Sequence, residues 1–449
     1  MKNAILLCSG TGTNGEDLSR FPGKSIAQVP QLKRIIINCQ RVGIEQFHII
    51  TDNSGLLKNF LIDDLRITSD INWVFPGESV SIDSGRVLIL ESSLVVTNSG
   101  FLEKFVRDSV DCQEDEFSVL VNQDADPVVG MDRETGYVNR YFGGGSSVLG
   151  AFSVNSTEVS AVLSAAGLDT WLGEEATRCH IRIFGADSGC WYRLSDTAES
   201  RKEAERIIFS HVGKTATGWI ARNINGRMSL PLSKLLIRTP LTPNAVSVLI
   251  NLIGVLCGPF YALGYPVLGA LFMQVATVLD RCDGEVARIK LMETKKGQWV
   301  DTISDQFTVL SFLIGVPVGY YLQTGSTVAI VLGSYNILVF ILFLIWSFYF
   351  LIKYTDSGSL VAYFEVDKHV NPEKLSVLRK LLAHLRPLGR RNYYSAGLVL
   401  IAIIGGNSLV LFATSFALTL FLLHQLEDVV RIFRLGKSEE VFHEETEQS

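Results

Sequence analysis

Apolar segments of about 20 residues recur in the second half of the chain and constrain its fold more than any other feature. They lie at residues 244–263, 266–287, 298–321, 328–352, 393–404 and 409–430. A helix needs about 20 apolar residues to cross the hydrocarbon core of a bilayer. The sequence therefore predicts an all-α domain of six transmembrane helices, with the shortest segment separated from the last at Gly405-Gly406-Asn407.

Basic residues divide the connections between these segments into two classes. The connections near Gly264, Thr324 and Gly406 contain no Lys or Arg. The other connections and flanks contain Arg227, Lys234, Arg238, Arg288, Lys290, Lys295, Lys296, Lys374, Arg379, Lys380, Arg386, Arg390, Arg391, Arg431, Arg434 and Lys437. Positively charged loops stay on the cytoplasmic side, so we expect an integral protein of the cell membrane with both termini in the cytoplasm. Arg379, Lys380, Arg390 and Arg391 are also candidates to bind a phosphorylated or lipid partner.

Residues 1–224 have a different character. Short β-rich runs at 4–8, 47–51, 87–90 and 118–121 alternate with polar and helical stretches, which is typical of an α/β domain with a largely parallel sheet. Nothing there is long enough to cross a bilayer. The net charge of -6 gives no indication of nucleic-acid binding, and seven cysteines without a CxxC pair argue against a disulfide framework or a zinc site.

The two halves are joined by residues 225–242. Apolar and polar side chains interleave there, which indicates either a helix lying at the membrane interface or a simple linker. In a helix, Pro231 is expected near the start. The transmembrane domain then covers 243–435, and residues 436–449 form a polar tail.

Four aspartates lie within the second and third apolar segments, where acids are costly and mark functional sites. Asp280 and Asp283 are three residues apart, and Asp301 and Asp305 are four apart, so each pair shares one helix face. Four carboxylates brought together by a helical hairpin would repel one another unless a divalent cation lay between them. Oxygen ligands favour Mg²⁺, Mn²⁺ or Ca²⁺ over zinc. A structural ion pair or an ion-transport pathway is the alternative interpretation.

Small residues accompany these acids. Gly284, Ala287 and Gly297 leave space for a bulky ligand, although close helix packing would also select glycine. Arg288 lies one turn beyond Gly284 and is a candidate phosphate partner.

The complete pattern D-x2-D-G-x2-A-R-x8-G-x3-D-x3-D is similar to that of the CDP-alcohol phosphatidyltransferase family, and the resemblance covers about residues 225–435. It implies that Asp280, Asp283, Asp301 and Asp305 hold a pair of metal ions, Mg²⁺ or Mn²⁺. Asp305 would also take the proton from the acceptor hydroxyl. Gly284, Ala287 and Gly297 would line the CDP pocket. The implied reaction is attack of an alcohol on the β-phosphate of a CDP-activated donor with release of CMP, in a protein that forms a homodimer in this family.

The N-terminal half resembles sugar-phosphate nucleotidyltransferases more loosely. Gly10 and Gly12 lie in a glycine-rich loop after the first strand, and Lys24 follows shortly after, so these residues are candidates to bind a nucleotide. Such a domain fused to the membrane domain resembles the inositol-phosphate cytidylyltransferase and di-inositol-phosphate phosphate synthase family.

This half also departs from the nucleotidyltransferase pattern. Asn14 replaces a basic residue, Gly23 interrupts the usual Pro-Lys pair, Glu91-Ser92-Ser93 stands where a metal-binding Asp is expected, and no second Asp lies near Gly150. Asp124 and Asp126 follow a strand and could compensate. We interpret the domain as one that no longer transfers nucleotides, because the acids that would bind metal are misplaced.

Three functions therefore compete. The favoured one transfers a phosphatidyl group from CDP-diacylglycerol to an alcohol, since the N-terminal acids are misplaced and the charged fraction is a modest 19%. The alternative transfers from a soluble CDP-polyol such as CDP-inositol to inositol phosphate, with an active N-terminal cytidylyltransferase. A non-catalytic, nucleotide-sensing membrane scaffold is the third.

Overall fold

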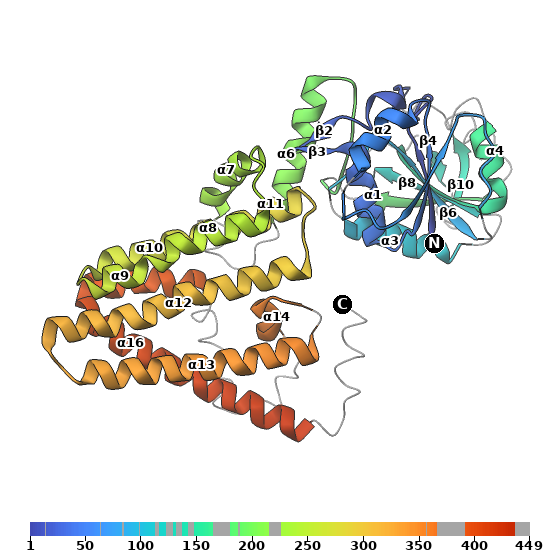
Figure 1. Cartoon of the computed structure of the whole chain (residues 1–449). Helices are drawn as coiled ribbons and strands as arrows, with labels where there is room; N and C mark the ends of the chain where they lie inside the picture. The colour runs from blue at the N-terminus through green and yellow to red at the C-terminus, as the bar shows by residue number, and fades with distance from the viewer. Residues whose placement is uncertain are drawn as a thin grey trace. The chain divides into compact units, whose positions relative to one another are not determined.

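The computed structural model of the chain, drawn in Figure 1, describes residues 1–13, 15–62, 64–82, 85–97, 99–112, 116–122, 129–131, 137–141, 148–164, 180–186, 189–214, 226–355, 357–365 and 391–435. It divides into two compact units. The first comprises Met1–Thr215 with Ile289–Leu291, and the second comprises Ala216–Arg288 with Met292–Ser449.

The first unit is built on one nine-stranded sheet with the order β5-β4-β1-β6-β11-β8-β12-β10-β9. Its strands are β1 (Asn3–Leu7), β4 (Gln46–Ile50), β5 (Asp70–Val74), β6 (Arg86–Glu91), β8 (Glu116–Asn122), β9 (Val129–Met131), β10 (Tyr137–Tyr141), β11 (Val148–Asn155) and β12 (His180–Ala186). Two small ribbons pair β2 (Ser25–Ile26) with β3 (Val29–Pro30), and β7 (Leu94–Val96) with β13 (Trp191–Arg193).

The four strands predicted from sequence form as β1, β4, β6 and β8. The sheet is mixed, however, and not largely parallel. β5, β4, β1 and β6 run parallel, but β11 lies antiparallel between β6 and β8, and the β10 pairings are also antiparallel. Local sequence could not predict this, because strand direction depends on pairing between segments far apart in the chain.

The first unit also contains helices. They are η1 (Leu18–Arg20), α1 (Gln31–Arg41), α2 (Ser54–Leu61), α3 (Ser99–Val110), η2 (Ser156–Glu158), α4 (Val159–Ser164) and α6 (Ala198–Lys214). The core lies between the sheet and helices such as α1 and α3, where Leu6, Leu88 and Phe105 are fully buried. Continuous apolar runs like that of β6 suit strands that are covered on both faces.

The second unit is helical. It comprises α7 (Gly226–Ile237), α8 (Pro243–Val255), α9 (Cys257–Ala262), α10 (Pro266–Leu279), α11 (Arg281–Ile289), α12 (Lys295–Thr324), α13 (Val328–Tyr354), α14 (Leu360–Glu365) and α16 (Arg391–Leu435). Among the described residues, four helices are long and apolar enough to cross a membrane, namely Pro243–Ala262, Lys295–Thr324, Val328–Tyr354 and Arg391–Leu423.

Three details differ from the sequence predictions. The predicted second span is divided at Asp280 into α10 and α11, each shorter than a full crossing. The predicted fifth and sixth spans form α16, which contains a non-helical joint at Gly406 (φ 57°, ψ -152°), a conformation that only glycine adopts readily. Pro231 lies inside α7 rather than near its start, because the helix already begins at Gly226.

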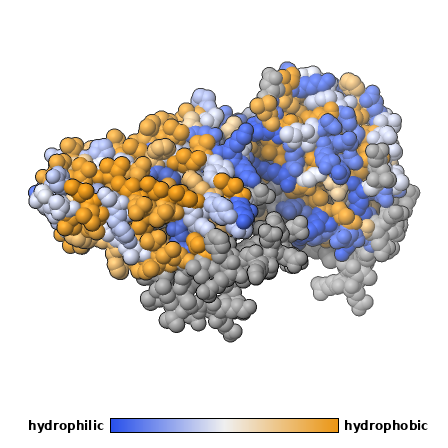
Figure 2. Space-filling model, turned by 60° about the horizontal axis from the view of Figure 1, so that its bottom comes forward, coloured by the Kyte–Doolittle hydropathy of each residue, from blue (hydrophilic) through white to orange (hydrophobic). Residues whose placement is uncertain are grey.

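Apolar side chains also cover the outside of the long helices. Leu322, Val331, Ile345 and Ile404 are all more than half exposed. Figure 2 shows hydrophobic residues spread broadly over the surface of the helical unit. Apolar patches of this extent mark contact with a membrane or a partner. Together with the length of the helices, they are typical of a membrane domain.

Candidate active site

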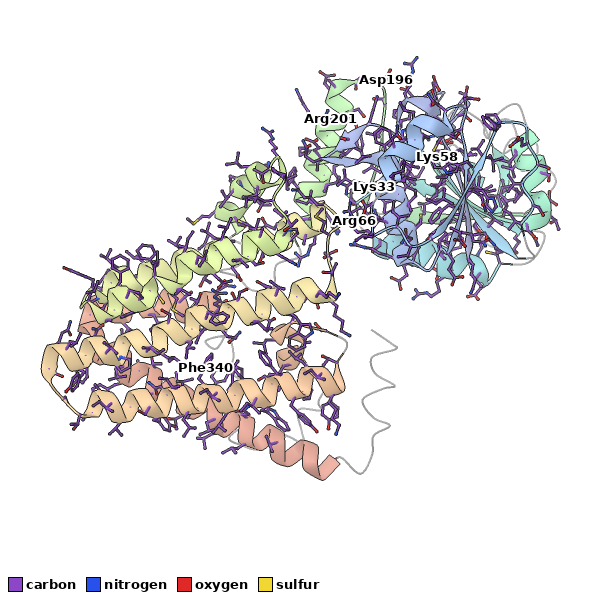
Figure 3. All side chains as sticks on the ribbon, viewed as in Figure 1. Lys33, Lys58, Arg66, Asp196, Arg201 and Phe340 are labelled. Atoms are coloured by element: carbon purple, nitrogen blue, oxygen red, sulfur yellow. The ribbon has the colours of Figure 1, made fainter. Side chains whose placement is uncertain are left out.

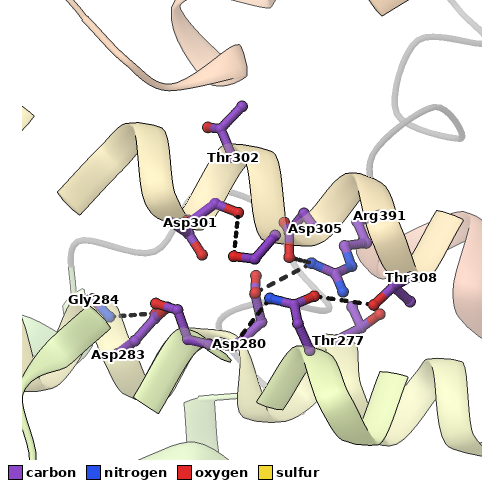
Figure 4. A network of polar contacts seen from close by, with 12 residues as sticks. Thr277, Asp280, Asp283, Gly284, Asp301, Thr302, Asp305, Thr308 and Arg391 are labelled. Atoms are coloured by element: carbon purple, nitrogen blue, oxygen red, sulfur yellow. Dashed lines mark hydrogen bonds and ion pairs between the residues drawn. The ribbon is translucent and has the colours of Figure 1, made fainter. Parts of the chain in front are cut away.

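Three of the four predicted aspartates converge in the helical unit. Asp280 lies at the joint between α10 and α11, and Asp301 and Asp305 lie one turn apart on α12. Each offers a carboxylate oxygen, and the three oxygens lie within 4.8 Å of one another. Figure 4 shows these side chains pointing into the space between the two helices. The hairpin geometry expected from the spacing of the acids is therefore present.

The carboxylates have the properties of metal ligands. Oδ1 of Asp301 and Oδ1 of Asp305 are buried, and neither accepts a well-formed hydrogen bond from the described residues. Buried polar atoms normally have partners, so such oxygens are suited to a bound cation. All-oxygen ligation of this kind suits a hard divalent ion.

Arg391, at the start of α16, lies beside the same cluster. Its Nη1 is 3.1 Å from Oδ1 of Asp280 and 2.5 Å from Oδ1 of Asp305 (Figure 4). The contact with Asp305 is an ion pair by distance but lacks hydrogen-bond geometry. The buried Nε and Nη2 atoms of Arg391 have no partner among the described residues. The guanidinium therefore has donors to spare for an anionic ligand.

Asp283 contacts Asp301 and has further partners of its own. Its Oδ1 accepts a hydrogen bond from the backbone N–H of Gly284 at 2.5 Å, and its Oδ2 accepts one from the hydroxyl of Ser247 on α8. Asn251 donates to the carbonyl of Ser247 and accepts from Thr308 on α12 at 3.0 Å. A buried polar chain thus orients Asp283, which lies outside the cluster of three. Sequence analysis missed Ser247, although a hydroxyl in an apolar span was a signal.

The glycines of the motif differ in their surroundings. A side chain at Gly284 would meet nothing within 4 Å, so helix packing does not require glycine there and the space is open to a ligand. At Gly297 a Cβ would lie 3.1 Å from the side-chain oxygens of Asn244 and Thr294, so crowding accounts for this glycine. Ala287 is half-buried, while Arg288 is exposed and pairs with Glu293 at 3.6 Å.

Some predicted residues lie outside the part of the chain that the structure describes. Arg379, Lys380 and Arg390 belong to this group in the membrane domain. Asp124 and Asp126 belong to it in the first unit.

The candidate nucleotide loop of the first unit follows β1, as predicted. Gly10 has φ +83°, which explains the glycine. Lys24 donates to Oδ1 of Asp196 at 2.5 Å, and Arg20 donates to Oδ2 of the same carboxylate at 2.5 Å. Figure 3 labels Asp196 beside α6. Hydrogen bonds from Lys24 and Arg20 hold the pKa of Asp196 below its usual range.

The chain is similar to several known proteins. Residues 240–433 match the family model described as CDP-alcohol phosphatidyltransferase. Two curated relatives, each named "Bifunctional IPC transferase and DIPP synthase", are similar to the chain. The one from Aquifex aeolicus is 24% identical over 335 residues, which cover 70% of this chain and 76% of the relative. The one from Thermococcus kodakarensis is 26% identical over 360 residues, which cover 75% and 82%.

Among solved structures, the inositol-1-phosphate CTP transferase from T. maritima aligns with 46% of this chain and 96% of its own length, at 13% identity and a TM-score of 0.34. The aligned lengths of the two curated relatives exceed the segment 240–433, so their similarity reaches into the N-terminal unit. The convergent aspartates and the matched segment lead to one conclusion: this chain is an enzyme that carries a membrane domain of the CDP-alcohol phosphatidyltransferase family.

Proposed function

We propose that the membrane domain transfers a polyol phosphate group from a soluble CDP-polyol, with CDP-inositol as the first candidate, to an inositol phosphate, and releases CMP. The observation that carries the chemistry is the cluster of Asp280, Asp301 and Asp305. The shared name of the two relatives supports this donor over CDP-diacylglycerol, which the sequence alone favoured.

In this proposal Asp280, Asp301 and Asp305 hold the divalent ions, Mg²⁺ or Mn²⁺, and Asp283, which contacts Asp301, would complete the set. Bound metal would neutralise the charge that develops on the pyrophosphate and on the departing CMP. Ser247 would orient Asp283 for this purpose, as ligands of metals are commonly oriented by a further hydrogen bond.

The acceptor hydroxyl oxygen attacks the β-phosphorus of the donor. A new bond forms between that oxygen and the phosphorus, and the bond from the phosphorus to the bridging oxygen of CMP breaks. Asp305 accepts the proton of the hydroxyl, a contribution worth roughly 10²–10⁴-fold in rate for a well-placed base.

Other residues bind the substrates. The open space at Gly284 and the neighbouring Ala287 would receive the cytidine diphosphate, with Arg288 and Gly297 at the edge of the same region. The spare donors of Arg391 suit the phosphate of the acceptor, since a guanidinium binds phosphate through paired N–H groups. Arg379 and Arg390 are proposed to join it.

The proposed function also implies an arrangement of the chain in the membrane. The membrane domain would make six crossings, with α10–α11 as one crossing and α16 as two crossings joined at Gly406. Both termini would lie in the cytoplasm of a cell-membrane protein, where the soluble substrates occur, and α7 would lie at the interface. A homodimer is proposed from the family resemblance.

A second candidate uses CDP-diacylglycerol as donor and makes a phospholipid. It is favoured by the lipid-facing apolar surface of α12, α13 and α16, along which an acyl chain could reach the site. The aspartates would act in the same way with either donor.

The test is CMP release by the purified protein with Mg²⁺ or Mn²⁺. CDP-inositol and CDP-diacylglycerol would each be offered with inositol, inositol phosphate and other polyols. CMP formed from CDP-inositol and inositol phosphate supports the first candidate. CMP formed only from the lipid donor supports the second, and the absence of CMP with every donor supports a scaffold.

The variant Asp305→Asn provides the check on mechanism. We expect a loss of at least about 10²-fold in turnover with retained CDP binding, because the amide cannot accept the proton. Asp70→Asn is the matched control, since Asp70 is an exposed acid of β5 in the other unit. Unchanged turnover in Asp305→Asn would contradict the proposed base.

A further inference from the structure

The resemblance of the N-terminal unit to nucleotidyltransferases implies a metal site at the end of β6. Glu91 is the acid found there, and its side chain is completely buried. Oε1 accepts a hydrogen bond from the backbone N–H of Thr13 at 2.7 Å, and Oε2 accepts one from Nη2 of Arg193. The hydroxyl of Ser93 lies 3.3 Å from Oε2. Both oxygens are thus engaged within the protein.

Arg193 lies directly against this carboxylate. Its Nη1 donates to the carbonyl of Val148 at 2.6 Å, and its Nη2 reaches the hydroxyl of Thr13 as well as Glu91. A Cβ at Gly150 would lie only 2.6 Å from Oε2 of Glu91. The two positions at which acids were expected therefore converge, and a guanidinium lies against the carboxylate. The positive charge of Arg193 would repel a cation at this place.

Backbone amides of the glycine-rich loop are likewise occupied by hydrogen bonds within the protein. The backbone N–H of Gly12 donates to the carbonyl of Glu16 at 2.9 Å, and that of Gly15 donates to the carbonyl of Gly12 at 2.9 Å. The N–H of Thr13 is occupied by Glu91. A phosphate-binding loop works by presenting free amides to the anion, and these amides are already used. Lys24, the candidate phosphate ligand, is paired with Asp196.

From these contacts we infer that the N-terminal unit does not perform cytidylyl transfer and that the donor of the membrane domain is made by a separate enzyme. The supplying reaction is attack of an alcohol phosphate oxygen on the α-phosphorus of CTP. The bond from that phosphorus to the bridging oxygen breaks, and pyrophosphate leaves. The need for such a donor rests on the proposed function, whereas the inactivity of the N-terminal unit does not.

The first test measures two products in one full-length preparation. With Mg²⁺, CTP and a panel of polyol phosphates, we expect no pyrophosphate above the rate without enzyme, while the same preparation releases CMP from a ready-made CDP donor. Pyrophosphate release that is lost in Glu91→Gln, Lys24→Ala, Asp124→Asn or Asp126→Asn would overturn the inference. Failure of CMP release alone would count against the proposed function and leave this inference standing.

A second test does not depend on the choice of substrate. In the full chain carrying Asp280→Asn, Asp301→Asn and Asp305→Asn, the membrane site is disabled, and bound Mn²⁺ can be counted by electron paramagnetic resonance. We expect no stoichiometric Mn²⁺ in this variant. One Mn²⁺ that remains and is removed by a further Glu91→Gln substitution would show a working metal site beside Arg193 and refute the inference.

Discussion

Arg391 lies beside the aspartate cluster and is a candidate ligand for the phosphate of the acceptor. Its Nη1 lies beside two of the aspartates, and its Nε and Nη2 atoms have no hydrogen-bond partner among the described residues. If these donors bind the phosphate of the acceptor, Arg391→Gln should raise KM for inositol phosphate by roughly 10–100-fold, because a hydrogen bond to a charged group contributes about 1.5–3 kcal/mol. KM for unphosphorylated inositol should change much less.

Two further variants serve as comparisons for that measurement. Arg391→Lys keeps the charge but lacks the planar fork, so it should recover only part of the affinity. Lys353 lies on the exposed end of α13, so Lys353→Gln should leave KM unchanged for both inositol phosphate and inositol. An equal rise in KM for the phosphorylated and unphosphorylated acceptors would contradict the assignment of Arg391.

Asp64 gives the N-terminal unit a pH-dependent element of stability. It accepts hydrogen bonds from Nε of Arg66 at 2.7 Å and pairs with Lys33 at 2.6 Å (Figure 3 labels both cations). These donors, Arg66 first, hold the pKa of Asp64 well below its usual range. The stability that the ionised group contributes is therefore fully present above the unfolded value near pH ~4 and is lost as the pH falls below it.

Asp64→Asn should accordingly lower the stability of the N-terminal unit by about 1–3 kcal/mol at neutral pH. The difference from the natural protein should shrink as the medium is acidified below the usual aspartate pKa. Thermal unfolding of the full chain in detergent at several pH values measures this, with Asp52→Asn as an exposed control. A difference that stays constant across the pH range would contradict the role of Asp64.

Single residues were predictable where spacing carried the information. The motif placed Asp280, Asp301 and Asp305 on facing helices, and the structure brings them together. Ser247 was not predicted, because its role depends on how α8 packs against α11, and a local sequence pattern does not encode that contact.

At the scale of elements, hydrogen bonds join α7 to α11, the helix that carries part of the aspartate motif. Ser229 and Ser233, both fully buried on α7, donate to the two oxygens of Glu285 on α11 at 2.9 and 2.7 Å. Glu285 also pairs with Arg281 at 3.3 Å. The helices α7 and α11 are thus joined through one buried carboxylate.

Glu285→Ala should destabilise the membrane domain by about 3 kcal/mol, because it leaves buried partners unpaired. Once Glu285 is removed, replacing Ser229 and Ser233 by alanine should add little, since the residues act as one unit. Unfolding in mixed detergent micelles measures both. Glu293→Ala, which removes an exposed pair, is the control and should change stability by less than about 1 kcal/mol. Additive effects would show that the serines and Glu285 act separately.

The elements themselves were predictable to different degrees. Long apolar runs predicted α12 and α13 well, because length and hydropathy are local properties. The division of the predicted second span at Asp280 was not predicted, because the apolar pattern of that span continues past Asp280 into the aspartate motif. The joint at Gly406 fell within the predicted boundary, where consecutive glycines interrupt the apolar run.

At the scale of the whole molecule, topology in the membrane is the prediction that matters. Six crossings would place both termini on the cytoplasmic side. Epitope tags at residues 1 and 449 should then both be protected from protease in sealed spheroplasts and both be cleaved in inside-out vesicles. Tags cleaved from opposite sides would indicate an odd number of crossings and refute the proposed arrangement.

The sequence by itself predicted an α/β unit followed by a membrane domain, and it identified four acids as candidates for the chemistry. Both follow from local properties, namely the length of apolar runs and the spacing of carboxylates along a helix. Only the tertiary structure decided that β11 makes the sheet mixed, that Arg391 joins the aspartates, and that Arg193 lies against Glu91. These contacts join residues roughly 60 to 110 positions apart, and such pairs are brought together by the packing of whole elements.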